Sequence, residues 1–408
     1  MSKEKLNVGM IGFGARGTLL LRDIILPMGK SDIKAVCDSY EDRAAKAADK
    51  VEEVQGTRPA VSLDYKEVIE SPDIDTVIIT CAWEDHIKVA MEAMRAGKAV
   101  GMEVGGAYTI EQCWDLVRTY EETQVPIMML ENCCYGRREM MAMHMAELGV
   151  LGTIVHCKGG YHHDLRDEVS GGEKYRHYRL RNYLNRNCEN YPTHELGPIA
   201  QLLHINRGNR MVSLVSTSSK AAGLHEYVND RFGSEHSLAN SQFAQGDIVT
   251  TAIRCAGGET ITLTLDTTLP RYYSRDFTVR GTKGMYEEAT DSVFLDKVHE
   301  EYDFKWKEQW GNAEKYSEEY EHPMWKAYKE EGVRGSHDGM DWLVFREFFD
   351  SILNGIPCPI DVYDIAAWMC ITALSEQSIL LGSQPVMIPD FTKGAWITRE
   401  KKCVVSNN

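Results

Sequence analysis

A phenol and an imidazole stand three residues apart, as Tyr191 and His194, in the segment CENYPTHELGPIAQLL. Residues at this spacing share one face of a helix, so both side chains are expected to approach one target. Both groups are titratable or polarisable, so the pair is a candidate for binding or deprotonating a substrate. Thr193 and Asn190 have an alternative interpretation in the same turn, as residues that only cap a helix.

Further hydroxyl, imidazole and guanidinium groups on either side of this turn are candidates for a substrate site. They are Tyr161, His162 and His163 in GGYHHDLR, Arg179 in YRHYRLRNY, and Tyr273 in LPRYYS. Each also has a structural interpretation, because tyrosines on strands are usually half-buried packing residues and the segment 174–186 is typical of a basic surface loop. The two histidines are adjacent, so on a strand they point to opposite faces and make poor joint metal ligands. No metal site is predicted.

The N-terminal segment LNVGMIGFGARG places three glycines, Gly12, Gly14 and Gly17, between an apolar strand and a helix. This spacing permits a tight turn and lets backbone N–H groups at the helix N-terminus approach a pyrophosphate. Asp38 ends the second strand, where a carboxylate accepts hydrogen bonds from ribose hydroxyls and repels a 2′-phosphate. The pattern predicts a site for NAD rather than NADP. The alternative is the same fold with an empty crevice.

Aromatic and polar side chains stand where later strands of this region end. They are Trp83 and His86, then Glu103 and Val104, then Glu131 and Asn132. Ligands of open α/β sheets bind at the carboxyl ends of the strands, so these residues are expected near the cofactor. Trp83 is equally well explained as helix-packing core. Asn132 is harder to explain that way, because an amide at the end of an apolar strand needs hydrogen-bond partners.

The order of the elements predicts two domains. Up to about residue 132, apolar strands alternate with helices, the first of which stops before Pro27, as is typical of a doubly wound parallel sheet. Beyond it, alternating strands are expected at 153–162, 211–219, 247–256, 260–267 and 275–281, and closing helices at 340–355 and 362–381.

The predicted fold is therefore α/β, with an N-terminal Rossmann domain that has a doubly wound parallel sheet at residues 1–132. Residues 133–408 are expected to form a substrate-binding α+β domain with a large, mostly antiparallel open sheet. The final helices are expected to pack back on the Rossmann domain, and the open sheet to pair two copies into a homodimer.

Composition limits the partners. The formal net charge of −16 over 408 residues argues against nucleic acid and anionic membranes, which reward clustered Lys and Arg. No apolar stretch reaches the roughly 18 residues of a membrane span. The 11 cysteines follow no repeating spacing and several lie in apolar runs, which is typical of a reducing compartment. The first strand begins almost at once, leaving no room for a signal peptide, so a cytoplasmic protein is expected.

Together these segments resemble the Gfo/Idh/MocA oxidoreductase superfamily and, within it, glycoside hydrolase family 109, which is typified by NAD-dependent α-N-acetylgalactosaminidases. The matching pieces include WEDH, EVGGAYTIEQCWDLV, LENCCY, GGYHHDLR, NYPTHELGPIAQLLHINRGNR and LPRYYS, between about residues 6 and 380. The resemblance implies NAD contacts at Ala15, Arg16, Asp38, Trp83, Glu84, Asp85, His86, Glu103, Val104 and Asn132. It implies sugar contacts at Tyr161, Arg179, Tyr191, Pro192, Thr193, His194 and Tyr273, with Tyr191 also near the nicotinamide.

The chain departs from these families at identifiable points. Glu195 follows the turn where the resemblance leads us to expect a glycine, and this change is expected to alter the sugar pocket. Where the dehydrogenases of the superfamily carry Glu-Lys-Pro, this chain has Glu103-Val104-Gly105 and lacks their catalytic lysine. Many family members are exported, whereas no leader is evident here, so an imported or intracellular glycoside is the expected substrate.

The resemblance implies an NAD-dependent glycosidase, a recognised exception to the two-carboxylate mechanism. A hydride passes from C3 of the sugar to NAD⁺, the C2 proton becomes acidic, the group at C1 is eliminated, water adds and the hydride returns. Tyr191 and His194 are expected to carry the proton transfers, with Tyr161 as the alternative base near C2, while Arg179 and Tyr273 orient the sugar. A plain NAD-dependent sugar or cyclitol dehydrogenase and a non-catalytic NAD or sugar sensor are the alternatives.

Overall fold

The structure is a computed structural model and describes residues 4–300 and 305–401. The chain forms two compact units. Unit 1 consists of the chain up to Tyr135 together with Gly332–Ala366, and unit 2 consists of Gly136–Glu331 together with the described chain from Ala367 on. One helix, α16 (Val362–Leu380), begins in unit 1 and continues in unit 2.

Unit 1 contains a six-stranded parallel sheet in the order β3-β2-β1-β4-β5-β6. Its strands are β1 (Leu6–Ile11), β2 (Ser31–Cys37), β3 (Ala60–Ser62), β4 (Thr76–Ile79), β5 (Ala99–Met102) and β6 (Ile127–Met129). The strands β4, β5 and β6 are buried at every position, as expected when both faces of a sheet are covered. The strand order reverses at β1, which confirms the doubly wound Rossmann sheet.

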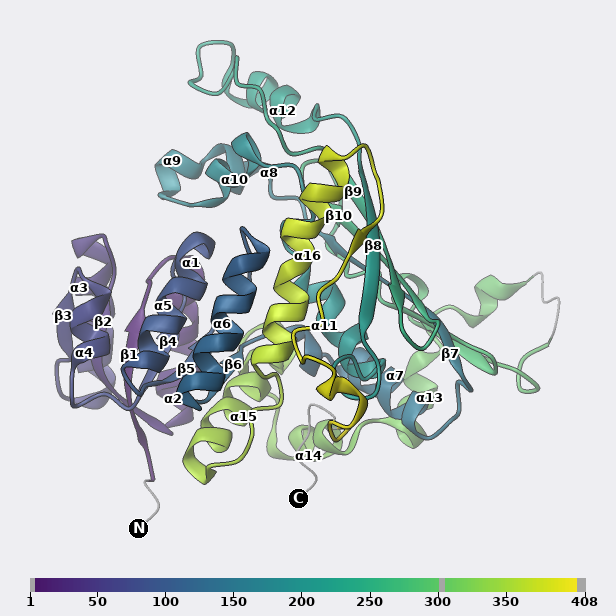
Figure 1. The fold of residues 1–408 in the computed structure, drawn as a ribbon, viewed down its shortest axis with the longest axis horizontal. Coiled ribbons are helices and arrows are strands. Elements are labelled where there is room, and N and C mark those ends of the chain that lie inside the picture. The colour runs from purple at the N-terminus through teal and green to yellow at the C-terminus, as the bar shows by residue number, and fades with distance from the viewer. Residues whose placement is uncertain (1–3, 301–304, 402–408) are drawn as a thin grey trace. The chain divides into compact units, whose positions relative to one another are not determined.

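Helices cover this sheet. They are α1 (Ala15–Leu20), η1 (Leu21–Ile25), α2 (Leu26–Met28), α3 (Glu41–Gln55), α4 (Tyr65–Glu70), α5 (Trp83–Arg95), α6 (Ile110–Thr123), η2 (Asn132–Tyr135), η5 (His337–Gly339) and α15 (Met340–Asn354). Figure 1 shows α5 and α6 side by side, and α5 packs on β4 and β5. A capping box at Thr109 and Gln112 defines the start of α6.

The first helix does not stop before Pro27, as the sequence predicted. It passes from α1 through the π-helical turn η1 into α2, which contains Pro27, and its C-cap is Gly29 with φ +70°. Proline has no N–H to donate to the preceding turn of an α-helix, and a π-helical turn changes the hydrogen-bond pairing at that point. The helix therefore includes Pro27 and ends one residue later, at Met28.

Unit 2 contains an eight-stranded sheet in the order β13-β12-β11-β7-β10-β9-β8-β14. Its strands are β7 (Ile154–His162), β8 (Met211–Ser218), β9 (Ile248–Cys255), β10 (Thr260–Asp266), β11 (Thr278–Gly281), β12 (Gly284–Glu287), β13 (Ser292–Leu295) and β14 (Val386–Met387). Only the pair formed by β7 and β10 is parallel, which confirms the mostly antiparallel sheet. The five predicted strands are present, whereas β12, β13 and β14 were not predicted.

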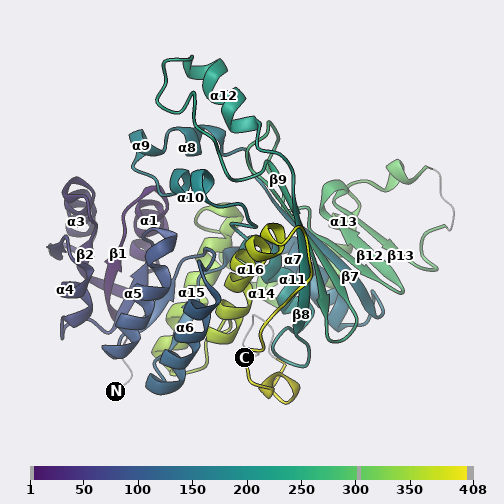
Figure 2. The same cartoon turned by 45° about the horizontal axis from the view of Figure 1, so that its top comes forward.

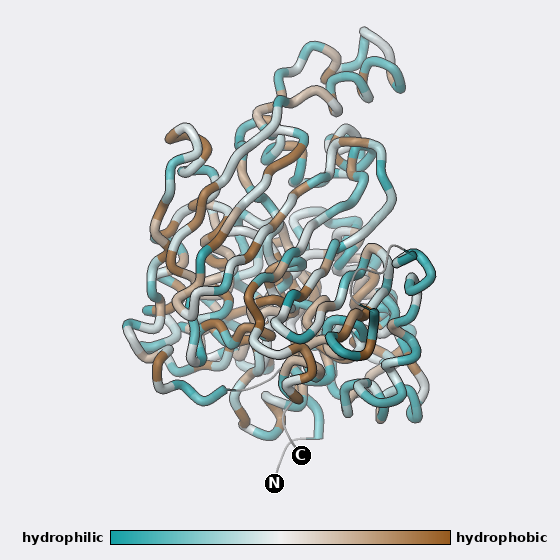
Figure 3. Tube along the Cα trace, turned by 90° about the vertical axis from the view of Figure 1, so that its right-hand side faces the viewer, coloured by the Kyte–Doolittle hydropathy of each residue, from teal (hydrophilic) through white to brown (hydrophobic). Residues whose placement is uncertain are grey.

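The helices of unit 2 are α7 (Arg137–Glu147), α8 (Arg166–Ser170), α9 (Gly172–Tyr175), α10 (Arg179–Asn185), α11 (Thr193–Leu202), α12 (Gly223–Phe232), η3 (Glu288–Thr290), η4 (Trp306–Gln309), α13 (Ala313–Tyr320), α14 (Pro323–Glu331) and η6 (Ala395–Ile397). Helices α7 and α11 pack together, and α11 packs on β7 (Figure 2). Buried and exposed residues alternate along β9 and β10, so one face of the sheet is covered and the other is open (Figure 3).

Candidate active site

The glycine-rich turn of unit 1 has the shape that a dinucleotide requires. Gly12 has φ +99°, and a Cβ placed on it would lie 2.5 Å from the backbone nitrogen of Cys81. A Cβ on Gly17 would lie 2.2 Å from the carbonyl oxygen of Gly12. A larger residue at either position would collide with backbone, so these glycines permit the close packing of the turn, α1 and the end of β4. Gly14, the N-cap of α1, has open space around it, and this space fits a pyrophosphate.

Asp38, at the end of β2, holds this turn from the other side. Its Oδ2 accepts the N–H of Phe13 at 2.6 Å, and its Oδ1 accepts the N–H of Tyr40 at 2.9 Å. Each carboxylate oxygen has a further lone pair, so the same group can still accept from ribose hydroxyls. Asp38 therefore has a structural role in the turn, and its role as an acceptor for ribose hydroxyls stays a prediction.

Arg16 is tied into unit 1 by two carboxylates. Its Nη1 and Nη2 each donate to one oxygen of Asp341 at 2.8 Å, and its Nε donates to Glu103 at 3.1 Å. The bidentate geometry fixes the plane of the guanidinium. Sequence reasoning predicted Arg16 and Glu103 as cofactor contacts but missed Asp341, which lies 325 residues from Arg16 along the chain.

Asp341 also accepts hydrogen bonds from the other polar groups around it. Its carboxylate accepts from Asn132 Nδ2 at 2.8 Å, Ser336 Oγ at 2.5 Å and His337 Nδ1 at 2.7 Å. Burial alone would raise the pKa of Asp341, but hydrogen bonds and charge from His337 and Arg16 hold that pKa well below its ordinary value. The partners that the Asn132 amide needs are thus found inside unit 1.

The predicted cofactor residues at the start of α5 have different contacts. Trp83 is 4% exposed, and a Cβ on Gly105 would lie 2.8 Å from its Cδ1, so the indole packs against the chain that follows β5. His86 Nε2 lies 3.0 Å from the carbonyl oxygen of Cys81. Burial lowers the pKa of His86 to about 4, so the imidazole is neutral and supports the loop after β4.

The remaining predicted cofactor contacts differ in exposure. Ala15 and Asp85 are exposed at the starts of α1 and α5. Glu84 is half-buried, with the Tyr108 hydroxyl 3.5 Å from its Oε2. Val104 is buried and its N–H donates to Glu103 Oε2 at 3.2 Å. Exposure at the helix starts leaves Ala15 and Asp85 accessible to a ligand at this edge.

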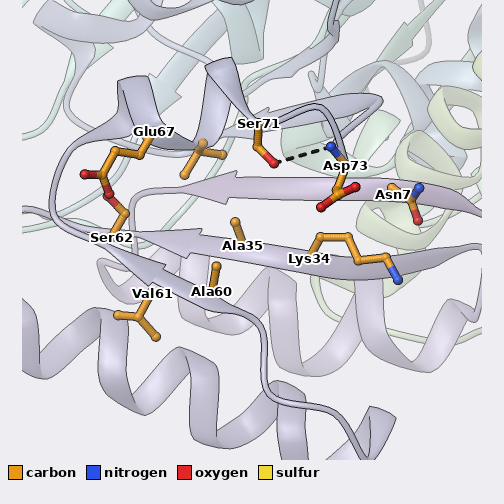
Figure 4. Close-up of a pocket in the computed structure, with 10 residues that line it drawn as sticks. Asn7, Lys34, Ala35, Ala60, Val61, Ser62, Glu67, Ser71 and Asp73 are labelled. Atoms are coloured by element: carbon orange, nitrogen blue, oxygen red, sulfur yellow. Dashed lines mark hydrogen bonds between the residues drawn. The ribbon is translucent and has the colours of Figure 1, made fainter.

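A cavity of ≈ 490 Å³ opens elsewhere on unit 1, between the first three strands and α4 (Figure 4). Its lining includes Asn7, Lys34, Ser62, Glu67 and Asp73. None of the predicted cofactor residues lines it. The cavity is therefore distinct from the glycine-rich edge.

In unit 2 the structure brings the predicted catalytic residues together in one aromatic cluster. The hydroxyl of Tyr191 lies 3.5 Å from His194 Nε2, with ring centroids 4.8 Å apart. The ring of Tyr161, from the end of β7, lies 4.4 Å from that of Tyr191 and 5.7 Å from that of His194. Tyr191 precedes α11 and His194 is its second residue, so the start of this helix positions both side chains.

His163 and Tyr273 extend the cluster. The Tyr161 hydroxyl lies 3.2 Å from His163 Nδ1, and the His163 ring packs edge-on against Tyr273 with centroids 5.2 Å apart. Tyr273 is 46% exposed, so the cluster reaches solvent on this side. His162, by contrast, is not among these contacts, which agrees with the expected alternation along the strand. His163 was a sequence candidate, and the structure adds it to the cluster.

A buried cation lies against two of the phenol rings. The guanidinium carbon of Arg179 is 5.0 Å from the ring centroid of Tyr191 and 5.9 Å from that of Tyr161. Its Nε pairs with Glu168 at 2.7 Å. This arrangement stabilises negative charge on either phenol oxygen. Glu168 was missed by sequence reasoning, because no local spacing connects it with Arg179.

The turn itself is buried. Pro192 is the N-cap of α11, Thr193 is its first residue, and no side chain caps the helix. Asn190 donates to Gln245 Oε1 at 3.2 Å instead. The capping interpretation of Thr193 and Asn190 is therefore wrong.

The Rossmann sheet with its glycine turn and a carboxylate at the end of β2, and the open sheet that carries the aromatic cluster, are typical of an NAD-binding protein of the oxidoreductase type. Residues 6–131 match the model of the oxidoreductase family with an NAD-binding Rossmann fold, Gfo/Idh/MocA. Residues 135–398 match the glycosyl hydrolase 109 C-terminal domain. The chain belongs to glycoside hydrolase family 109, and it is an enzyme with an NAD-binding domain.

Relatives support this assignment over nearly the whole chain. An α-N-acetylgalactosaminidase of Bacteroides fragilis is 39% identical and covers 98% of this chain and 94% of its own length. A glycosyl hydrolase family 109 protein of Stenotrophomonas maltophilia is 38% identical, with coverages of 97% and 91%. An α-N-acetylgalactosaminidase of Tannerella forsythia is 36% identical, with coverages of 98% and 89%.

Solved structures agree on the fold. Levoglucosan dehydrogenase in complex with NADH has a TM-score of 0.69 at 19% identity, covering 95% of this chain and all of its own. The scyllo-inositol dehydrogenase of Lactobacillus casei has a TM-score of 0.65 at 13% identity, with coverages of 95% and 99%.

Among the described helices, none combines the length and apolar composition needed to cross a membrane.

Proposed function

We propose that this enzyme hydrolyses α-N-acetylgalactosaminides or closely related hexosides, using NAD as a cofactor that is regenerated in each turnover. The observation that carries the proposal is the cluster of Tyr161, Tyr191 and His194 against the buried guanidinium of Arg179. The names of the relatives from Bacteroides fragilis and Tannerella forsythia support the choice of sugar. The carboxylate of Asp38 supports NAD over NADP, because it would repel a 2′-phosphate.

When bound, NAD⁺ supplies a reversible hydride acceptor at C3 of the sugar. Tyr191 and His194 accept the proton of the C3 hydroxyl and return it at the end of the cycle, and their 3.5 Å separation permits the proton to pass between them. Tyr161 would remove the C2 proton once C3 is a ketone, and the group at C1 would leave. Water would then supply hydroxide to C1 and a proton to the leaving group, Tyr161 would return its proton to C2, and the hydride would return to C3. The Arg179 guanidinium stabilises the phenolate forms, and Tyr273 orients the sugar at the exposed side of the cluster.

The test is a screen of nitrophenyl α- and β-glycosides with added NAD⁺, run on the wild type, Tyr191→Phe and His194→Ala. We expect release of nitrophenol without net NADH, and losses of about 10²–10⁴-fold in each variant. Tyr286→Phe is the matched control, since Tyr286 is equally buried but bonds Asp291 at 3.2 Å outside the cluster. In D₂O, deuterium must enter C2 of the product.

Other outcomes are informative. Stoichiometric NADH formed from a free sugar would show a sugar or cyclitol dehydrogenase, and NAD binding without turnover on any glycoside would show a sensor. Absence of deuterium at C2 would exclude the elimination route.

We also propose a homodimer formed through the open face of the unit 2 sheet, and a cytoplasmic location. The open face presents the outward residues of β9 and β10, such as Ala252 and Thr262. None of the ten described cysteines is in a disulfide bond, which supports a reducing compartment. Light scattering of the purified protein tests the dimer, and cell fractionation tests the location.

A further inference from the structure

Two carboxyl groups are buried beside the aromatic cluster of unit 2. Glu189 is 0% exposed and Glu195 is 1% exposed, and each carboxyl group lies close enough to the other to affect its ionisation. Both oxygens of Glu195 and Oε2 of Glu189 are buried and accept no well-aligned hydrogen bond from the described residues. Two ionised carboxylates in this arrangement would repel each other without compensation. The pair therefore retains a proton between its two carboxyl groups.

The pair connects the elements that carry the cluster. Glu189 Oε1 accepts the N–H of Tyr191 at 3.4 Å, and the Glu189 N–H donates to Ser375 Oγ at 2.8 Å. Glu195 directly follows His194 on α11, and its carboxyl group lies next to the backbone of Tyr161 on β7. Strand and helix are in close contact here, because a Cβ on Gly159 would lie 3.0 Å from Glu195 Cβ.

We propose that Glu189 and Glu195 share one proton and act together as positioning residues for Tyr161, Tyr191 and His194. The inference rests on the proposed function and deepens it. The shared proton holds α11, the segment before it and β7 in one arrangement, and loss of that proton places two negative charges behind the tyrosines. The family resemblance led us to expect glycine at position 195. In this chain the residue is Glu195, whose carboxyl group pairs with that of Glu189.

The direction of the pKa shifts agrees with this geometry. Burial raises the pKa of Glu189 to about 8, and burial together with the charge of Glu189 raises the pKa of Glu195 well above its ordinary value. The titratable and charged groups around the pair are the cluster residues Tyr161, Tyr191 and His194, and Asp276, which is ion-paired with Lys158. None of these is altered by substitution of Glu195.

Glu195→Gln is the decisive variant, because its amide permanently resembles a protonated carboxyl group and can donate to Glu189. We expect the wild-type kcat to decline above about pH 8. The variant should keep kcat within about 3-fold of the wild type at pH 7 and should lose this decline. Glu195→Ala removes the partner and is expected to lower kcat at least 10-fold with a smaller change in KM. Glu347→Gln is the control: burial raises the pKa of this half-buried carboxyl group in unit 1 to about 7, and the variant should keep the alkaline decline.

A second measurement does not depend on turnover. Because the folded pKa of Glu189 is raised, the folded state binds more protons than the unfolded state, so the melting temperature should fall as pH rises from about 5 to 8. Glu195→Gln should reduce this fall even if no glycoside is a substrate, which separates failure of this inference from failure of the proposed function. The inference is overturned if Glu195→Gln leaves both pH dependences unchanged, if Glu195→Ala matches Glu195→Gln in kcat, or if metal analysis finds one cation per chain that Glu195→Gln abolishes.

Discussion

Replacement of Asp341 by asparagine should lower the free energy of unfolding of unit 1 more than any substitution on the exposed surface of the same helix, α15. The carboxylate is 0% exposed and accepts from Arg16, Asn132, Ser336 and His337. Asparagine offers one oxygen in place of two and no charge, so the Arg16 guanidinium loses its bidentate partner. Breaking a buried ion pair in this way costs about 3–5 kcal/mol in the free energy of unfolding. For a unit of this size that lowers the melting temperature by on the order of 10 °C.

The assay is thermal and urea unfolding with and without NAD⁺, with Asp350→Asn as the control. Asp350 lies on the same helix α15 and pairs with Lys30, but its side chain is 36% exposed, so the control should lose less than about 1 kcal/mol. The pKa of Asp341 is depressed in the folded state, so its contribution is present at neutral pH and is lost as pH falls below the ordinary range of aspartate. The variant should therefore lose less stability than the wild type on acidification. Equal stability of the two variants at pH 7 would refute the role assigned to the Asp341 network.

Three further outcomes are expected. Gly17→Ala should abolish detectable NAD binding in a fluorescence titration, since its Cβ would lie 2.2 Å from a carbonyl oxygen. Gly14→Ala is the comparison: no atom lies within 4 Å of a Cβ at this position, so this variant should still fold. Asp38→Asn should weaken NAD⁺ binding by about 10-fold or more in the same titration, because the charge-assisted hydrogen bonds to the turn and the ribose are lost. Thr262→Arg, on the open face of β10, should convert the proposed dimer to monomer in light scattering, and an unchanged mass would exclude this face as the interface.

The architecture was predictable where apolar runs were long and bounded by turn residues. The strand LNVGMI and the helix that begins at Trp83 are examples, because burial on both faces leaves a continuous apolar signal in a parallel strand. The strands β12 and β13, with four residues each, were missed because such short segments carry almost no periodicity. The helical continuation past Pro27 was missed because a π-helical turn has no simple sequence signal.

The site was predictable only where its residues are close in sequence. Their closeness in sequence predicted that Tyr191 and His194 lie together, although Tyr191 precedes α11, and strand alternation separated His162 from its neighbours. The partners of Arg16 and Arg179 were not predictable, since the pairing of a guanidinium with a distant carboxylate depends on tertiary packing. Glu195 was noticed only as a departure from an expected glycine, and its pairing with Glu189 requires the structure.

In both candidate sites the carboxylates bond to the groups expected to meet the ligand. Asp341 holds Arg16, Glu168 holds Arg179, and the Glu189–Glu195 pair lies against the backbone of the tyrosines. A hydrolase with two opposed carboxylates needs both of them at the substrate, one as acid and one as base or nucleophile. Groups already paired with guanidinium or buried with a shared proton are poorly suited to that task. In the proposed mechanism, transient oxidation makes a sugar C–H acidic, and the phenol and imidazole groups of the cluster would exchange the protons that this mechanism requires.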